Sequence, residues 1–159
     1  MEEKKLAIIA TKGTLDWGYP PFILASTAAA LGYETEIFFT FYGLQLLKKD
    51  LKLEVSPLGN PGMPMPMGMD KWFPVLGTAL PGMQAVMTSM MKKKMASKGV
   101  ASLEELRELS QEADVKLIAC QMTVDLFEMD TSEFIDGVEY AGAARFFEFA
   151  GESDICLYI

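Results

Sequence analysis

Two short segments of the chain, Leu6–Thr11 and Val115–Cys120, are apolar at almost every position. A strand with one face in water alternates apolar and polar residues, whereas a central strand of a parallel sheet is covered on both faces and is apolar throughout. Both segments have the length of strands and are too short for buried helices. They therefore predict two central strands of a parallel sheet.

Three other segments complete the predicted sheet. The β-branched and aromatic segment Thr35–Phe41 predicts a strand, and so does Asp154–Ile159. Leu51, Leu53 and Val55 alternate with polar residues, which predicts an edge strand with one wet face. The fold class that follows is a three-layer α/β/α sandwich with a mainly parallel five-stranded sheet. Numbered along the chain, the strands are expected in the order 3-2-1-4-5.

Segments with helical character separate these strands. Gly32 is expected to end the first helix, and Ser102-Leu-Glu-Glu105 fits the capping box of a later one. We expect helices at 20–31, 42–49, 82–98, 102–113, 123–129 and 138–150. A chain of 159 residues suits a single domain, 1–159, interrupted by a loop at about 57–81 that is rich in methionine and proline.

Charge and composition exclude several classes of function. The net charge of −8 argues against a nucleic-acid partner, because phosphate binding depends on clustered Lys and Arg. The chain contains no histidine, which excludes Ser–His–Asp and Cys–His catalysis and histidine-bound zinc. No segment reaches the roughly 18 apolar residues of a spanning helix and no signal-peptide pattern begins the chain. We therefore expect a cytoplasmic protein with no transmembrane segment.

The thiol of Cys120 is the predicted chemical centre. In open α/β sheets, ligands bind beyond the carboxyl ends of the strands where the winding reverses, which in the expected order lies between Leu6–Thr11 and Val115–Cys120. A sulfur at the start of a helix faces free N–H groups, which favour the thiolate. The candidate pocket, in which Lys12 adds a positive charge, is formed by Lys12, Gly13, Thr14, Asp16, Gln121, Met122 and Thr123. The alternative interpretation is that Cys120 is a small buried hydrophobe.

Two further residues bear on this prediction. Asp125 would oppose thiolate formation if its carboxylate pointed at the sulfur of Cys120. Cys156 lies between Ile155 and Leu157 in the last predicted strand, and we expect it in the core. In a reducing compartment both cysteines are expected to be free thiols.

The segment Gly62–Met69 holds a thioether at every second position, Met63, Met65, Met67 and Met69. Thioethers bind soft metals such as Cu(I), but they also form adaptable apolar contact surfaces, which is the interpretation we favour. The helix that follows has a methionine stripe and Lys92–Lys94, a pattern similar to that of membrane-surface helices, so peripheral membrane contact is an alternative. Nucleotide binding at Lys12-Gly13-Thr14 is a further alternative, although the spacing of a P-loop is absent.

Six motifs are spread over nearly the whole chain. They are Lys12–Asp16, Phe38–Gly43, Ser56–Asn60, the Met-Pro repeat, Ala119–Thr123 and Phe134–Gly142. Together they resemble the DsrE/DsrF-like (DsrEFH-like) family, and within it the DsrE-related, peroxiredoxin-like subgroup of sulfur-metabolising prokaryotes.

That resemblance implies a parallel α/β/α sandwich that assembles into homo-oligomers. It also implies a sulfur carrier, which holds a persulfide on a cysteine and relays it to a protein partner, with no cofactor. The Ala119-Cys-Gln-Met122 motif makes Cys120 the carrier, in a sulfurtransferase-like relay rather than a multiple-turnover enzyme. Peroxidase activity is not expected, because no Thr-x-x-Cys signature surrounds Cys120. The alternative is a non-catalytic oligomeric binding module that uses the Met/Pro-rich loop for a soft metal or a membrane-associated partner.

Overall fold

The computed structural model describes residues 4–58, 77 and 79–159, which form two compact parts. The first part comprises the chain up to Gly13 together with Trp17–Lys52 and Ser102–Ile159. The second comprises Thr14–Asp16 and Leu53–Ala101. The methionines of the segment 62–69 lie outside the described residues, so the roles predicted for Met63, Met65, Met67 and Met69 stay predictions.

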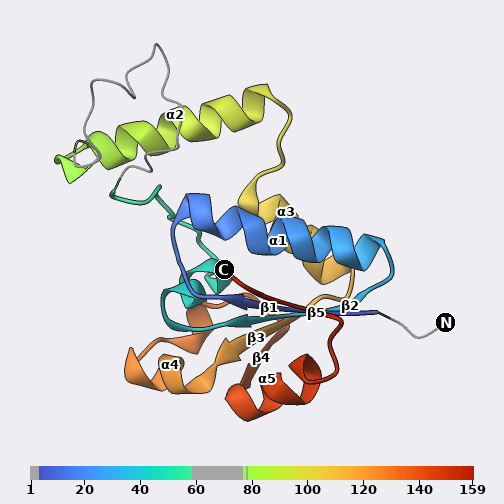
Figure 1. Ribbon diagram of the computed structural model, residues 1–159. Helices are drawn as coiled ribbons and strands as arrows, with labels where there is room; N and C mark the ends of the chain where they lie inside the picture. Colours follow the sequence, from blue (N-terminus) through green and yellow to red (C-terminus); the bar gives the residue numbers. More distant parts are fainter. Residues whose placement is uncertain (1–3, 59–76, 78) are drawn as a thin grey trace. The chain divides into compact units, whose positions relative to one another are not determined.

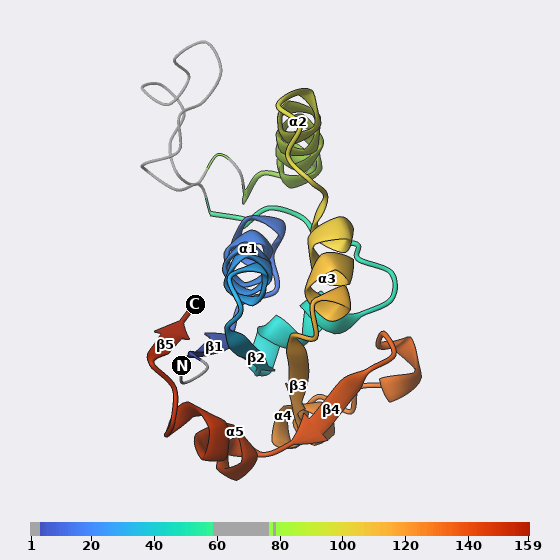
Figure 2. The same ribbon diagram turned by 90° about the vertical axis from the view of Figure 1, so that its right-hand side faces the viewer.

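The first part is the predicted three-layer α/β/α sandwich. Its five strands are all parallel and run in the order β4-β3-β2-β1-β5. They are β1 (Lys5–Ala10), β2 (Glu34–Phe39), β3 (Lys116–Cys120), β4 (Val138–Ala141) and β5 (Ile155–Tyr158). Helices α1 (Leu15–Ala30) and α3 (Leu103–Glu112) cover one face of the sheet, and α4 (Gln121–Leu126) and α5 (Ala143–Ala150) cover the other (Figure 1; Figure 2).

The local signals at the helix ends are confirmed. Gly32, just after α1, has a φ of +84°, the left-handed conformation in which glycine ends helices. The Ser102 side chain accepts the N–H of Glu105 while the Glu105 carboxylate accepts the N–H of Ser102, which is the predicted capping box at the start of α3. Two 3₁₀ helices, η1 (Phe41–Leu47) and η4 (Thr131–Glu133), follow β2 and α4. Among the described residues, no helix is long and apolar enough to span a membrane.

The predicted strand order is wrong. β2 lies between β1 and β3, so the first strand and the strand that ends at Cys120 are not neighbours. The segment 138–150, expected to be one helix, is β4 followed by α5. Gly142 separates the two, with an extended conformation (φ −93°, ψ 178°) at the start of α5. The end of β2, rather than the end of β1, therefore adjoins the end of β3.

Leu51, Leu53 and Val55 are buried, as their alternation predicts, but they do not form a strand. In the second compact part, helix α2 (Met83–Ser97) binds the backbone of this segment with its side chains. The Val55 N–H donates to Thr88 Oγ1 at 3.0 Å, and Gln84 Nε2 donates to the Val55 carbonyl at 2.8 Å. Alternating burial therefore does not require a neighbouring strand when side chains satisfy the backbone groups.

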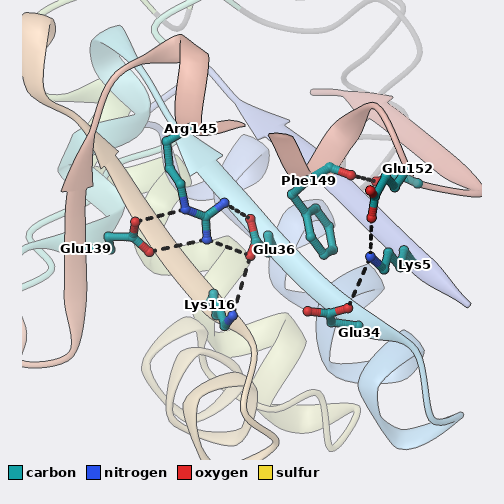
Figure 3. Close-up of polar contacts among 9 residues, drawn as sticks. Lys5, Glu34, Glu36, Lys116, Glu139, Arg145, Phe149 and Glu152 are labelled. Atoms are coloured by element: carbon teal, nitrogen blue, oxygen red, sulfur yellow. Dashed lines mark hydrogen bonds and ion pairs between the residues drawn. The ribbon is translucent and has the colours of Figure 1, made fainter. Parts of the chain in front are cut away.

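Two groups of ion pairs attach α5 to the sheet (Figure 3). The Arg145 guanidinium binds both carboxylate oxygens of the buried Glu36 on β2, at 2.9 and 3.1 Å, and reaches Glu139 on β4 at 3.0 Å. At the other end of the helix, Lys5 Nζ on β1 lies 2.8 Å from the carboxylate of Glu152. These contacts fix the position of α5, which covers the sheet face on which Cys120 lies.

Candidate functional site

Cys120 is the last residue of β3 and immediately precedes α4. Its backbone is extended (φ −65°, ψ 108°), and it pairs with Ala141 of β4. The apolar run of β3 ends here because Gln121 begins the helix, so the thiol lies at the carboxyl end of the sheet as predicted. This is the region in which α/β folds bind their ligands.

The side chain of Cys120 is buried, with 5% of its surface exposed. It belongs to a core cluster that includes Phe38, Ile118 and Phe146. The rings of Phe38 and Phe146 are 5.1 Å apart, which places aromatic carbon over this face of the sheet. Burial alone would give the inert cysteine of the alternative interpretation.

Hydrogen-bond donors distinguish Cys120 from such an inert thiol. Burial acts to raise the pKa of the Cys120 thiol, but the donors around the sulfur act in the opposite direction and prevail. They are the hydroxyl and N–H of Thr123, the hydroxyl of Thr40 and the N–H of Met122. The pKa of Cys120 is therefore below the usual value of a free thiol, and the thiolate is populated more than in an ordinary cysteine.

Thr123 connects the sulfur to the neighbouring strand. Its side chain is fully buried, and its Oγ1 accepts the N–H of Phe41 at 3.3 Å. That contact occupies a lone pair of the oxygen, so the hydroxyl proton remains available to the sulfur or to Thr40 Oγ1, which is 3.3 Å away. The two threonine hydroxyls form a small polar site within an apolar environment, where hydrogen bonds to a charged sulfur are strong.

Thr40 is the member of this site that the sequence analysis missed. It directly follows β2, and the sequence predicted that the strand would continue through Phe41. The expected strand order also put Leu6–Thr11 between this strand and the strand that ends at Cys120. A hydroxyl within the aromatic run 38–42 is the signal that could have identified it.

The loop after β1 has partners of its own. The Lys12 ammonium lies 3.2 Å from the centre of the Trp17 ring. Gly13 packs so closely on η1 that a Cβ there would collide with the carbonyl oxygen of Tyr42. Since β2 separates β1 from β3, the topological reason for placing this loop beside Cys120 does not hold.

Thr14 and Asp16 belong to the second compact part, where both bind Ser56. The Asp16 carboxylate accepts the Ser56 N–H at 2.9 Å and the Ser56 hydroxyl at 2.8 Å. Thr14 Oγ1 lies 3.2 Å from Ser56 Oγ. These bonds hold a turn of the chain, and a role for Thr14 or Asp16 in a sulfur pocket stays a prediction.

The first turn of α4 separates polar from apolar groups. Gln121 Nε2 donates to the Asp125 carboxylate at 2.7 Å, and both side chains are exposed. Met122 presents its N–H to the sulfur of Cys120 while 62% of its surface is exposed. The Asp125 carboxylate, considered above as an opponent of the thiolate, is thus held by Gln121 on the outside of the helix.

The prediction that Cys156 lies in the core is wrong. Cys156 is exposed on β5, which forms one edge of the sheet. An edge strand is covered less completely than a central strand, and the apolar neighbours of Cys156 in sequence did not reveal this. Both cysteines are free, so the chain offers one buried and one exposed thiol.

Among the residues that the structure describes, no three Cys, Asp or Glu side chains come together as metal ligands. The polar groups around Cys120 are hydroxyls and N–H donors, which suit an anion. The site can therefore stabilise a thiolate or a sulfur anion that extends from it.

Replacing Thr123 by valine tests the role of the hydroxyl. Valine preserves the size of the side chain but removes the donor, so the pKa of Cys120 should rise and its reaction with iodoacetamide at neutral pH should become roughly tenfold slower. Alkylation rates measured against pH in a Cys156→Ser background report this change. Thr27→Val, whose hydroxyl binds the carbonyl of Ile23 within α1, is the control and should leave the rate unchanged. Equal alkylation rates in the Cys156→Ser protein and in its Thr123→Val and Thr27→Val variants would contradict the role of the Thr123 hydroxyl as a donor to Cys120.

Comparisons with known proteins agree with this fold. The model of the DsrE/DsrF/DrsH-like family matches residues 2–158. Sulfur carrier protein DsrE2 of Allochromatium vinosum is 84% identical over 159 residues, the full length of both chains. Uncharacterized protein YrkE of Bacillus subtilis is 33% identical over 164 residues, which cover 99% of this chain and 98% of YrkE. The crystal structure of the ychN protein from E. coli has a TM-score of 0.54 at 12% identity, covering 98% of this chain and 99% of that one, a likeness that concerns the fold alone.

Proposed function

The chain belongs to the DsrE/DsrF/DrsH-like family, and from this membership and the surroundings of Cys120 we propose that it is a sulfur carrier. In this proposal Cys120 holds one sulfane sulfur as a persulfide and passes it to a protein partner. The name of the Allochromatium vinosum relative, with 84% identity over the whole chain, supports the carrier role.

The observation that carries the proposal is the lowered pKa of a buried thiol. Four donor groups act on the sulfur of Cys120 and prevail over its burial. A thiolate is the nucleophile in sulfur chemistry, and a persulfide anion presents a charged sulfur to the same kind of donor. Burial in turn limits contact with water and with other thiols, which would remove the sulfane sulfur.

Loading and release of sulfur balance without an external oxidant. The Cys120 thiolate attacks the sulfane sulfur of a polysulfide or of thiosulfate, whose S–S bond breaks as the shortened polysulfide or sulfite leaves. Cys120 then carries the persulfide. A thiolate of the acceptor protein attacks the outer sulfur, the S–S bond at Cys120 breaks, and the Cys120 thiolate is regenerated.

We place the carrier in the cytoplasm, because a reducing compartment keeps Cys120 and Cys156 out of disulfides and so leaves the Cys120 thiol available for sulfur. The same protein would act as a homo-oligomer, as the family resemblance implies. Thr40 and Thr123 hold the sulfur anion, and the relay consumes no cofactor.

Sulfur loading tests the proposal directly. The Cys156→Ser protein is incubated with polysulfide or thiosulfate, freed of the reagent, and weighed intact by mass spectrometry. We expect a gain of one sulfur atom per chain that dithiothreitol removes. A chain that stays at its original mass with both donors, while a small alkylating reagent still modifies Cys120, would defeat the carrier proposal.

A further inference from the structure

Five large apolar side chains are exposed around the end of the sheet that holds Cys120. They are Phe41 (45% exposed), Tyr42 (66%), Met122 (62%), Leu126 (60%) and Phe127 (40%), and we name them the aromatic patch. Phe41 and Tyr42 begin η1, and the others lie on α4 or directly after it. Figure 1 shows η1, in cyan, and α4 at the same end of the sheet. An exposed cluster of this kind marks an interaction site.

Ring contacts hold the aromatic patch in place. The Phe127 ring lies edge-on to Phe41 at 6.0 Å between centroids and is stacked on Tyr42 at 5.9 Å. Phe41 has a φ of +50°, a left-handed conformation that a bulky residue adopts only under constraint. Gly43 contributes to that constraint, because its missing Cβ lets η1 approach the Ala10 carbonyl oxygen. The backbone therefore keeps Phe41 at the surface.

The aromatic patch is joined to the sulfur through one residue. Thr123 Oγ1 accepts the N–H of Phe41, and the hydroxyl and N–H of Thr123 act on Cys120. Met122 contributes an N–H to the sulfur and an exposed side chain to the patch. A molecule seated on the patch would thus contact the residues that enclose the buried sulfur.

On the side of α4, the charged side chains beside the aromatic patch are carboxylates. Asp125, Glu128 and Asp130 are all exposed there. Of the nearby cations, Lys48 is paired with Glu133 at 2.9 Å, and Lys12 lies over the Trp17 ring. An anionic lipid surface would be repelled by these carboxylates, whereas a basic protein surface would be attracted.

We propose that the aromatic patch is the docking surface for the sulfur-exchanging protein, whose cysteine lies among apolar residues and is flanked by Lys or Arg on the side that faces α4. The inference rests on the proposed carrier function, because it is the need to reach a buried sulfur that makes the surroundings of Cys120 the place of docking. Apolar contact with the patch supplies affinity, and the charge contact orients the incoming cysteine.

Two synthetic peptides test this docking surface. Each contains one cysteine among Leu and Phe, activated as a mixed disulfide with pyridinethiol, and the peptides differ only in Lys or Glu flanks. In a Cys156→Ser background, the Cys120 thiolate attacks the cysteine sulfur of the peptide, a disulfide between Cys120 and the peptide forms, and pyridinethione leaves and is followed by absorbance. We expect the Lys peptide to react about tenfold faster than the Glu peptide at low salt, with the ratio falling towards one at high salt.

Variants of the patch separate docking from reactivity. Phe127→Ser removes the ring that contacts both Phe41 and Tyr42, and Tyr42→Ser removes the ring that is stacked on Phe127. Each should slow the Lys peptide about tenfold and leave the rate with a neutral dipyridyl disulfide unchanged. Phe147→Ser, which removes a phenylalanine from α5 that is still more exposed (68%) than Phe127, is the control and should leave both rates unchanged.

Several outcomes would overturn the docking proposal. One is that the Lys and Glu peptides react at equal rates. A second is that the patch variants lose as much rate with the small dipyridyl disulfide as with the Lys peptide. A third is a change of oligomeric state in the Phe127→Ser protein, which would assign the patch to contacts between copies of this chain. Sedimentation with vesicles of phosphatidylserine and phosphatidylcholine that depends on Phe127 would assign it to a membrane. No sulfane sulfur is used, so failure of docking and failure of sulfur loading are recognised separately.

Discussion

The Cys120→Ser protein is expected to gain no sulfur from polysulfide or thiosulfate, whereas the Cys156→Ser protein gains one sulfur atom per chain. Serine has nearly the size of cysteine and can keep contacts with Thr40 and Thr123, so the fold is retained. A hydroxyl is not ionised at neutral pH and is a poor nucleophile towards sulfur. The loss should therefore be complete rather than partial, and intact mass spectrometry measures it.

The exposed Cys156 makes this comparison informative. An exposed thiol is the more accessible of the two, so simple access would load Cys156 rather than Cys120. Equal loading of the Cys120→Ser protein and the unsubstituted chain, located on Cys156 by peptide mass mapping, would contradict the assignment of the carrier. Circular dichroism of the Cys120→Ser protein provides the control for folding.

Replacing Arg145 by alanine is expected to lower the free energy of unfolding by about 3 kcal/mol, because it leaves a buried carboxylate without its main partner. Glu36 is 1% exposed, and Arg145 binds both of its oxygens (Figure 3). The remaining cation, Lys116, is 3.8 Å from Glu36 and half-exposed, and can replace only part of this interaction. Urea denaturation followed by circular dichroism measures the change.

Two variants test whether the buried charge is the cause. Glu139→Gln removes the exposed partner of Arg145 and should cost less than about 1 kcal/mol. Changing Glu36 and Arg145 together to methionine removes both charges and should recover most of the stability lost in Arg145→Ala. Unchanged stability in Arg145→Ala would show that Glu36 is stabilised by other means.

Since α5 also places Phe146 in the core cluster of Cys120, Arg145→Ala should make that thiol react faster with bulky alkylating reagents.

The fold class could be predicted from the sequence because burial on both faces leaves a strong pattern. The segment that forms β3 is apolar in sequence and buried from Leu117 to Cys120. The strand order could not be predicted, because the pattern of a strand records how it is covered and not which strand lies beside it. Val138–Ala141 was missed for a related reason: at an edge it is only partly buried and lacks an apolar run.

The candidate site was predictable as far as it depends on one stretch of chain. Cys120 and the donors of the following turn, Met122 and Thr123, come from a strand followed directly by a helix. Thr40 directly follows the neighbouring strand β2, so its place beside Cys120 depended on the strand order and was missed. The pocket role of Lys12 rested on the same order, and the structure instead places its ammonium over Trp17.

Hydroxyl and N–H donors keep the buried sulfur of Cys120 ionised, and a titration of Cys120 by thiolate absorbance in the Cys156→Ser protein tests this most directly. Subtraction of the spectrum of a protein that lacks both cysteines isolates the thiolate signal. Ionised tyrosines also absorb in the ultraviolet, but burial raises the pKa of Tyr19 and Tyr140 further above the pH range in which Cys120 titrates. We predict a midpoint below the pKa of an ordinary free thiol. A midpoint at or above that value would show that burial prevails over the hydroxyl and N–H donors, and would contradict the account.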